Sequence, residues 1–321
     1  MGYLKHPIAI ALLVWSAGVG LAGDGVIEIN QAKALAGEVT PSDTPGFPVT
    51  IDTEGSYLLT GNLDLHLLSK DIDAIKVIAN NVVIDLNGFE IEGPCAVPCV
   101  PVGIGGGIDA NVTHTTVRNG TIRNMGREGV SVGNFGVVTD VRTIDNSHYG
   151  IITGGFATVR NSVAAGNANV GIRPTTSSRV IDCTAEGNTL DGILPNGPGI
   201  ALIGNVVDGN SGDGIDAVFC SACLIENNTA RSNTGNGIVS AAGSVLRDNT
   251  SSDNTGWGIS AMGLASVLIG NSAYSNDGGG INAAADVGLS RNVSRFNTST
   301  DLAGGLLLDC NVIGGVLSCP P

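Results

Sequence analysis

Apolar and polar residues alternate over short stretches of three to five positions along most of this chain. A typical stretch runs from Val159 to Ala164 (Val-Arg-Asn-Ser-Val-Ala), and glycine or asparagine stands at the borders of such stretches. Alternation with a period of two predicts short β-strands with one buried face. Because Gly and Asn tolerate the left-handed backbone of a sharp corner, the pattern predicts many short strands joined by tight corners.

The stretches belong to a repeat. A glycine followed by an apolar residue recurs in steps of 22, 21, 21, 21, 22, 23, 21, 22 and 25 residues, at Gly107, Gly129, Gly150, Gly171, Gly192, Gly214, Gly237, Gly258, Gly280 and Gly305. An asparagine precedes seven consecutive members by four positions, at Asn146, Asn167, Asn188, Asn210, Asn233, Asn254 and Asn276. A fixed period of this length is typical of a solenoid.

These features predict an all-β fold, a right-handed parallel β-helix of about 11–12 coils with about 21–23 residues per coil. Stacked coils place equivalent residues about 4.8 Å apart, so the asparagine side chains can form a hydrogen-bonded ladder. Leucine-rich repeats need a leucine-dominated frame that is missing here, and left-handed hexapeptide helices need units of six residues.

The segment Asn80–Phe89 (Asn-Asn-Val-Val-Ile-Asp-Leu-Asn-Gly-Phe), followed by the Asn-x-x-x-Gly-Ile coils, resembles the pectate-lyase-like superfamily in its right-handed β-helix branch. The resemblance covers about residues 50–315. It implies the fold but no single activity, since that superfamily includes polysaccharide lyases, hydrolases, epimerases, phage tailspikes, adhesins and periplasmic proteins.

Three segments are expected. Residues 1–23 resemble a signal peptide, because Lys5 precedes an apolar run from Ile8 to Val19 and small residues follow, with cleavage near Gly23. Residues 24–50 would form an N-terminal cap, and residues 51–321 the β-helix with a C-terminal cap. We therefore expect a secreted or periplasmic protein with no membrane span after cleavage.

Net charge and cysteine content indicate which classes of ligand the protein can bind and in which compartment it works. The net charge is −14, and removal of Lys5 with residues 1–23 makes it −15, which disfavours binding to nucleic acid and to polyanionic sugars unless cations intervene. Three close cysteine pairs fit disulfides in an oxidising compartment: Cys95 with Cys99, Cys220 with Cys223, and Cys310 with Cys319. Cys183 remains, and we expect it to be a buried thiol.

In a regular stack, equivalent positions form columns on the surface. One column stands directly before each repeat glycine and includes Glu128, Tyr149, Asp191, Asp213 and Trp257. A second column stands two residues after the glycine and includes Asp109, Arg173 and Asp216. With His148, these positions predict a chemically mixed patch on one face. We assign candidate catalytic roles to Asp191, Asp213, Asp216 and Arg173, and candidate substrate-binding roles to Glu128, His148, Tyr149 and Trp257.

Two functions compete. The first is a scaffold that binds polysaccharide or cell-surface glycan without catalysis. The second is a polysaccharide-degrading enzyme. A hydrolase could use Asp191 and Asp213 at the ~5 Å separation of retaining enzymes, or Asp191 and Asp216 at a longer, inverting separation.

A uronate lyase or epimerase would instead bind Ca²⁺ at the aspartates, while Arg173, or His148 with Tyr149, moves the proton. The motif sets of polygalacturonases and mannuronan epimerases are missing, so no catalytic residue carries over from the family. Trp257 could be a sugar-stacking platform or a packed turn residue. The oligomeric state does not follow from the sequence.

Overall fold

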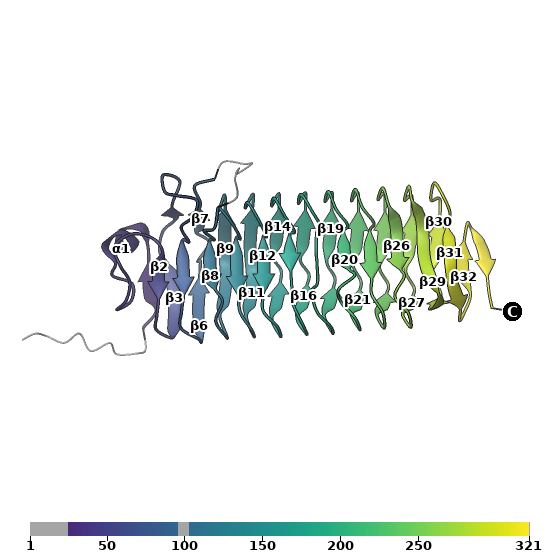
Figure 1. Cartoon of the computed structure of the whole chain (residues 1–321), viewed down its shortest axis with the longest axis horizontal. Coiled ribbons are helices and arrows are strands. Elements are labelled where there is room, and N and C mark those ends of the chain that lie inside the picture. Colours follow the sequence, from purple (N-terminus) through teal and green to yellow (C-terminus); the bar gives the residue numbers. More distant parts are fainter. Residues whose placement is uncertain (1–24, 96–102, 321) are drawn as a thin grey trace, which may run out of the picture.

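The computed structural model describes residues 25–95 and 103–320 of the chain. The expected signal peptide and Cys99 lie outside these residues. About 12 turns of some 22 residues stack into a parallel β-helix, which confirms the predicted fold class. The turns follow one another along the long axis from the N-terminal to the C-terminal end (Figure 1).

Each coil contributes strands to three faces, which we name A, B and C. Face A begins at the repeat glycine-isoleucine step and comprises β2 (Val49–Ile51), β5 (Ile75–Val77), β8 (Ile108–Ala110), β10 (Val130–Val132), β12 (Ile151–Thr153), β15 (Ile172–Arg173), β20 (Ile215–Ala217), β23 (Ile238–Ser240), β26 (Trp257–Ala261) and the first parts of β29 (Gly279–Ser290) and β31 (Leu302–Leu307).

Face B follows the next corner and comprises β1 (Ile27–Ile29), β3 (Gly55–Leu59), β6 (Val82–Asp85), the first halves of β9 (Thr116–Arg123) and β11 (Val137–Ile144), β13 (Thr158–Arg160), β16 (Arg179–Ile181), β18 (Ala201–Ile203), β21 (Leu224–Glu226), β24 (Val245–Arg247), β27 (Val267–Ile269) and the last parts of β29 and β31.

Face C completes each coil and comprises β4 (Leu63–Asp64), β7 (Glu90–Glu92), the second halves of β9 and β11, β14 (Val163–Ala165), β17 (Thr184–Glu186), β19 (Val206–Asp208), β22 (Thr229–Arg231), β25 (Thr250–Ser252), β28 (Ser272–Tyr274), β30 (Val293–Arg295) and β32 (Asn311–Ile313).

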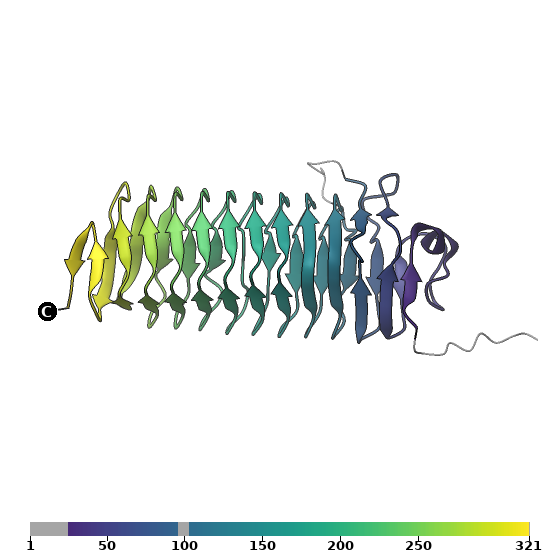
Figure 2. The ribbon, with the colours of Figure 1, turned by 180° about the vertical axis from the view of Figure 1, so that it is seen from behind.

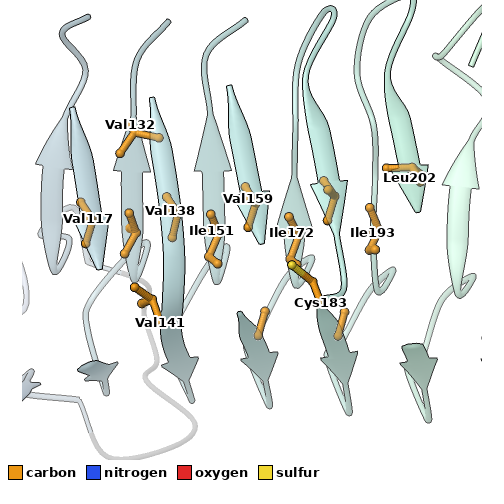
Figure 3. Packing of buried hydrophobic residues seen from close by; sticks show 14 of the residues in the cluster. Val117, Val132, Val138, Val141, Ile151, Val159, Ile172, Cys183, Ile193 and Leu202 are labelled. Carbon is orange, nitrogen blue, oxygen red and sulfur yellow. The ribbon is translucent and has the colours of Figure 1, made fainter. Parts of the chain in front are cut away.

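Rows of branched aliphatic side chains fill the interior. In Figure 3, Val117, Val138 and Val159 repeat along one row, and Ile151, Ile172 and Ile193 along another. All six are fully buried. Burial of one such side chain contributes about 1.5–3 kcal/mol, so the repeated rows provide the main stabilisation of the rod.

The predicted asparagine ladder is present. Asn188 Nδ2 donates to Asn210 Oδ1 at 2.9 Å, and Asn210 Nδ2 donates to Asn233 Oδ1 at 2.9 Å. The ladder extends from Asn146 to Asn297. Each amide also donates to a backbone carbonyl, so these buried polar side chains are satisfied within the stack.

A second asparagine ladder was not predicted from the sequence. It runs between faces B and C through Asn205, Asn228, Asn249, Asn271, Asn292 and Asn311. Asn205 Oδ1 also accepts a hydrogen bond from the backbone N–H of Cys183, at 3.0 Å. The thiol of Cys183 therefore occupies the position in its own coil that asparagine takes in the later coils.

The two ends of the rod are closed differently. Helix α1 (Gln31–Ala36) lies at the N-terminal end of the rod (Figure 2). It is capped by Asn30, whose Oδ1 accepts a hydrogen bond from the backbone N–H of Lys33. This helix, with its six residues, is the only one in the described part of the chain and is far too short to cross a membrane. At the other end, β32 pairs antiparallel with β33 (Val316–Ser318).

Two of the three expected disulfides are observed, Cys220–Cys223 in the loop after β20 and Cys310–Cys319 across the terminal hairpin. The Cys95–Cys99 pair cannot be described because Cys99 lies outside the described residues. Cys183 is a free, buried thiol, as expected, and burial raises its pKa to about 12.

Candidate functional site

Face A carries the two expected surface columns. The pairing of β5, β8, β10, β12 and β15 aligns Lys76, Asp109, Ser131, Ile152 and Arg173 on successive coils. Isolated bridges from Ile193 to Ile172 and to Ile215 carry the same register to Asp216. Each of these column residues is partly or fully exposed, between two buried neighbours on most strands.

The column before each glycine also stacks regularly. The backbone N–H groups of Gly171, Gly192 and Gly214 donate to the carbonyls of Asp191, Asp213 and Asn236, each on the following coil. The same bond links Gly107 to Glu128 and Gly237 to Trp257. Side chains 21–23 residues apart in the sequence are therefore held one coil apart in space.

Three aspartates, Asp191, Asp213 and Asp216, lie close together on face A. One carboxylate oxygen from each lies within 4.8 Å of the other two. Asp191 and Asp213 come from the corner that leads into face A, whereas Asp216 is the outward residue of β20. We call these three residues the aspartate triad.

The triad brings Asp191 and Asp216 close together. One carboxylate oxygen of Asp191 lies within 4.8 Å of one of Asp216, whereas the inverting arrangement considered for this pair separates the carboxyl groups by about 6.5–9.5 Å. Asp216 comes only three positions after Asp213, and the backbone N–H of Asp213 donates to Asp191. Asp216 therefore lies close to the corner that carries Asp191.

Two members of the triad also support the stack. Asp191 Oδ1 accepts a hydrogen bond from the backbone N–H of Asp213 at 2.8 Å, and Asp213 Oδ1 accepts from the backbone N–H and the side-chain amide of Asn236. Asp216 Oδ1 accepts from the backbone N–H of Val218 at 3.1 Å. The hydrogen bonds of the described residues leave Oδ2 of all three carboxylates without a donor.

Burial and mutual repulsion raise the pKa values of the triad carboxyl groups. Burial raises the pKa of Asp216 to about 6, and the carboxylates of Asp191 and Asp213 add to this shift. Burial also raises the pKa values of Asp191 and Asp213, partly offset by the hydrogen bonds that each accepts. Three carboxylates in such close contact favour either sharing a proton or binding a cation.

The triad is the one group of described residues whose His, Cys, Asp and Glu side chains are spaced to hold a metal ion. Its ligands are all oxygens, which suit a hard cation such as Ca²⁺. Ca²⁺ takes six to eight oxygen ligands, and Oδ1 of each aspartate already accepts a backbone hydrogen bond. Water or substrate oxygens would have to complete the coordination.

Four of the remaining predicted residues make a separate group on the neighbouring coils: Glu128, His148, Tyr149 and Arg173. Glu128 is only 7% exposed, and its Oε1 lies 3.0 Å from Arg127 Nε in an ion pair and 3.3 Å from His148 Nδ1. The His148 and Tyr149 rings lie 4.0 Å apart between centroids, and the Arg173 guanidinium carbon lies 5.5 Å from the Tyr149 centroid.

Among the described residues, no ion pair links Arg173 to the triad. The single patch predicted from the sequence is thus two groups on the same face, one carboxylate-rich and one mixed.

Trp257 lies further along face A and is partly buried. Its backbone N–H donates to Asn236 Oδ1 at 2.9 Å, which continues the line of side-chain acceptors from Asp191 and Asp213. The indole packs over Gly279 on the next coil, where a Cβ atom would come within 2.5 Å of the ring. The absence of a side chain at Gly279 therefore makes the room that the indole occupies.

A cavity of about 750 Å³ opens at the N-terminal part of face A and was missed by the sequence analysis. Its charged lining comprises Asp71, Asp73, Lys76, Asp109, Arg127 and Glu128. Only Asp109 and Glu128 belong to the two surface columns that the repeat revealed. The others lie in the first, irregular coils or at a corner, where the repeat signal is weak.

The comparisons with known proteins agree with this architecture. The family described as "Right handed beta helix region" matches residues 106–263 and 191–316. This chain belongs to the right-handed β-helix family. No curated protein sequence matches the chain significantly.

Solved structures share the fold at low sequence identity. The A-module of the mannuronan C-5 epimerase AlgE4 of Azotobacter vinelandii is 15% identical, with a TM-score of 0.53 over 79% of this chain and 88% of the module. The periplasmic alginate epimerase AlgG is 15% identical, with a TM-score of 0.55 over 81% of this chain and 70% of the epimerase.

PfbA, a surface adhesin of Streptococcus pneumoniae, is 10% identical, with a TM-score of 0.54 over 85% of this chain and 84% of the adhesin. Because these relatives include both enzymes and an adhesin, the shared fold does not assign an activity.

Proposed function

We propose that this protein binds an extended polysaccharide along face A. The observation that carries the proposal is the spacing of polar side chains along one face, from the cavity at β5, β8 and β10 past Ile152 to Arg173 and the aspartate triad. Stacked coils repeat every ~4.8 Å, which is close to the length of one pyranose unit, so successive sugars could meet successive coils.

The chemistry of the line suits sugar hydroxyls. Carboxylates accept hydrogen bonds from hydroxyl groups, and Arg173 and Arg127 donate them in a planar arrangement. Oδ2 of each triad member has no donor among the described residues, so it is available to a ligand hydroxyl. Tyr149 and Trp257 would add apolar contact to sugar rings.

The similar structures support a glycan ligand as well. Two of them are named as epimerases of mannuronan or alginate, and a third as a surface adhesin. We further propose that the protein works outside the cytoplasm, secreted or in the periplasm. The two disulfides and the signal-like residues 1–23 support this location.

A panel of neutral, amino and uronic polysaccharides tests the proposal. The chain of residues 24–321 would be passed through gels that contain each polymer, with and without Ca²⁺, and its retardation measured. Retardation by at least one polymer is expected. Normal mobility in every gel, with the protein folded by circular dichroism, would refute the binding function.

The triad favours a second candidate, hydrolysis of the bound polysaccharide. Retaining glycosidases place two carboxyl groups about 5–5.5 Å apart, and the triad oxygens lie within 4.8 Å. Asp216, with its pKa raised to about 6, would hold the proton for the leaving group. Asp213, which accepts two hydrogen bonds from Asn236, would act as the ionised partner.

New reducing ends in the same panel would detect hydrolysis, and unsaturated uronate absorbance would detect a lyase instead. Asp216→Asn should abolish the reducing ends and leave gel retardation in place. Full turnover by the Asp216→Asn protein would exclude Asp216 as the acid. Retardation without reducing ends or unsaturated uronate would reject both enzyme activities and support binding without catalysis.

A further inference from the structure

The 750 Å³ cavity on face A has the size of a ligand site and an uneven charge. Ligand pockets span about 300–1,000 Å³, so the cavity has room for a short stretch of oligosaccharide. Its walls come from β8, β10 and β12 and from the segment before β5, and Ile104 and Gly106 of the loop after β7 also line it. It thus forms the N-terminal end of the proposed polysaccharide path.

Both basic side chains of the cavity already have carboxylate partners. Lys76 Nζ lies 3.9 Å from Asp109 Oδ2, and Arg127 Nε lies 3.0 Å from Glu128 Oε1. Glu128 also faces His148 Nδ1. These pairs leave the cavity's local charge close to neutral apart from two further aspartates.

Those two, Asp71 and Asp73, have no basic partner among the ion pairs of the described residues. Asp73 Oδ1 accepts from the backbone N–H of Gly106 at 2.7 Å, and Asp71 Oδ1 accepts from that of Ile104 at 3.1 Å. None of the hydrogen bonds of the described residues uses Asp73 Oδ2. A partly buried carboxylate oxygen therefore remains open beside the cavity.

The surroundings of Asp73 compensate its negative charge only in part. Burial raises the pKa of Asp73, and the carboxylates of Asp109 and Glu128 add to this, while the hydrogen bond from the Gly106 N–H and the charge of Lys76 offset only part of the rise. A positive group next to Asp73 would relieve this cost. A uronate carboxylate in the same place would add a further negative charge.

We propose that the cavity binds an amino-bearing sugar unit, with the ammonium group against Asp73. This inference rests on the proposed polysaccharide-binding function and names its ligand class. The unit is a hexosamine without its acetyl group, because acetylation removes the positive charge. The ring hydroxyls then face Ser131, Asp109 and the other polar groups of the wall.

A matched pair of ligands tests the charge requirement. The glucosamine tetramer and its fully N-acetylated counterpart share one backbone and differ in charge, and calorimetry of residues 24–321 with each at pH 6 measures the difference. We expect the glucosamine tetramer to bind at least tenfold more tightly. Equal affinities, or tighter binding of the acetylated tetramer, would overturn the proposal.

Two variants locate the effect. Asp73→Asn keeps an oxygen for the Gly106 N–H and should remove most of the tenfold preference. Asp140→Asn, at the exposed corner of β11 between faces B and C, should keep this preference. If the wild-type preference persists in Asp73→Asn, the ammonium does not bind at Asp73. Failure of all polysaccharides to bind would instead refute the proposed function itself.

Discussion

The side chain of Asp191 accepts a hydrogen bond from the backbone N–H of Asp213, one coil further along the rod, at 2.8 Å. Asp213 repeats the contact with Asn236, and Asn236 with Trp257. Asparagine can replace aspartate in such a line because its amide oxygen accepts the same bond. The stacking role and the charge of these aspartates can thus be separated by substitution.

The double variant Asp191→Asn/Asp213→Asn should fold with little change in the free energy of unfolding and bind polysaccharide at least tenfold more weakly. Asp191→Ala should lose about 1 kcal/mol of stability, since the Asp213 N–H loses its acceptor. Urea denaturation and affinity gels measure the two effects. Unchanged affinity in the double variant would exclude a role for both charges.

Asp216 should make stability depend on pH. Because the folded protein holds the Asp216 proton up to a pH of about 6, whereas the unfolded chain releases it near 3.8, the free energy of unfolding falls as the pH rises between these values. Asp216→Asn should reduce this fall, with a gain of about 1 kcal/mol at pH 7 because the carboxyl is only partly buried.

Thermal unfolding of wild type and Asp216→Asn between pH 3.5 and 7.5 checks this. The two curves should coincide at the acid end, separate as the pH rises from about 4 to about 6, and stay apart at higher pH. A constant offset over the whole range would mean that the carboxyl titrates normally.

A substitution in the buried asparagine ladder should lower the free energy of unfolding far more than a substitution on the surface. Asn210→Ala removes the acceptor of both the backbone and the side-chain N–H groups of Asn188 and the donor to Ala185. Since each buried group left unpaired costs about 1–3 kcal/mol, we expect a loss of at least about 3 kcal/mol in urea denaturation. Thr189→Ala, at an exposed position one residue after Asn188, should change stability by less than about 0.5 kcal/mol.

Much of this architecture could be predicted from the sequence because only a few residue types suit the repeated positions. Glycine and asparagine fit the corners, and aliphatic residues fill the core. The glycine steps and the Asn146–Asn276 column correspond directly to stacked coils. The second ladder was harder to see because its column begins with Ser162 and Cys183, so asparagine appears only from Asn205 onward.

The candidate site could be predicted only in part. Register alone aligned the two columns, but the distance between Asp191 and Asp216 depends on where their side chains point across a corner. The cavity depends on how Ile104 and Gly106 lie against Asp71 and Asp73, outside the regular repeat. Periodicity carries no information on such contacts.

Cys183 should be inert until the rod unfolds. Its thiol is buried, and burial raises its pKa to about 12, so almost no thiolate is present at pH 8. Incubation with a thiol-reactive chromogenic disulfide should label it only in denaturant. Rapid labelling of the native protein at pH 8 would show that the coil around Cys183 opens readily.

The central claim is that face A is the ligand-binding face, and a pair of obstructing variants on one coil tests it most directly. Ile152→Trp places an indole on face A at β12, and Val163→Trp places one on face C at β14; both native side chains are partly exposed. With the polysaccharide that retards the wild type, gel affinity should fall at least tenfold for Ile152→Trp and stay unchanged for Val163→Trp. Loss of affinity in Val163→Trp alone, or equal affinity in both variants, would contradict the assignment of face A.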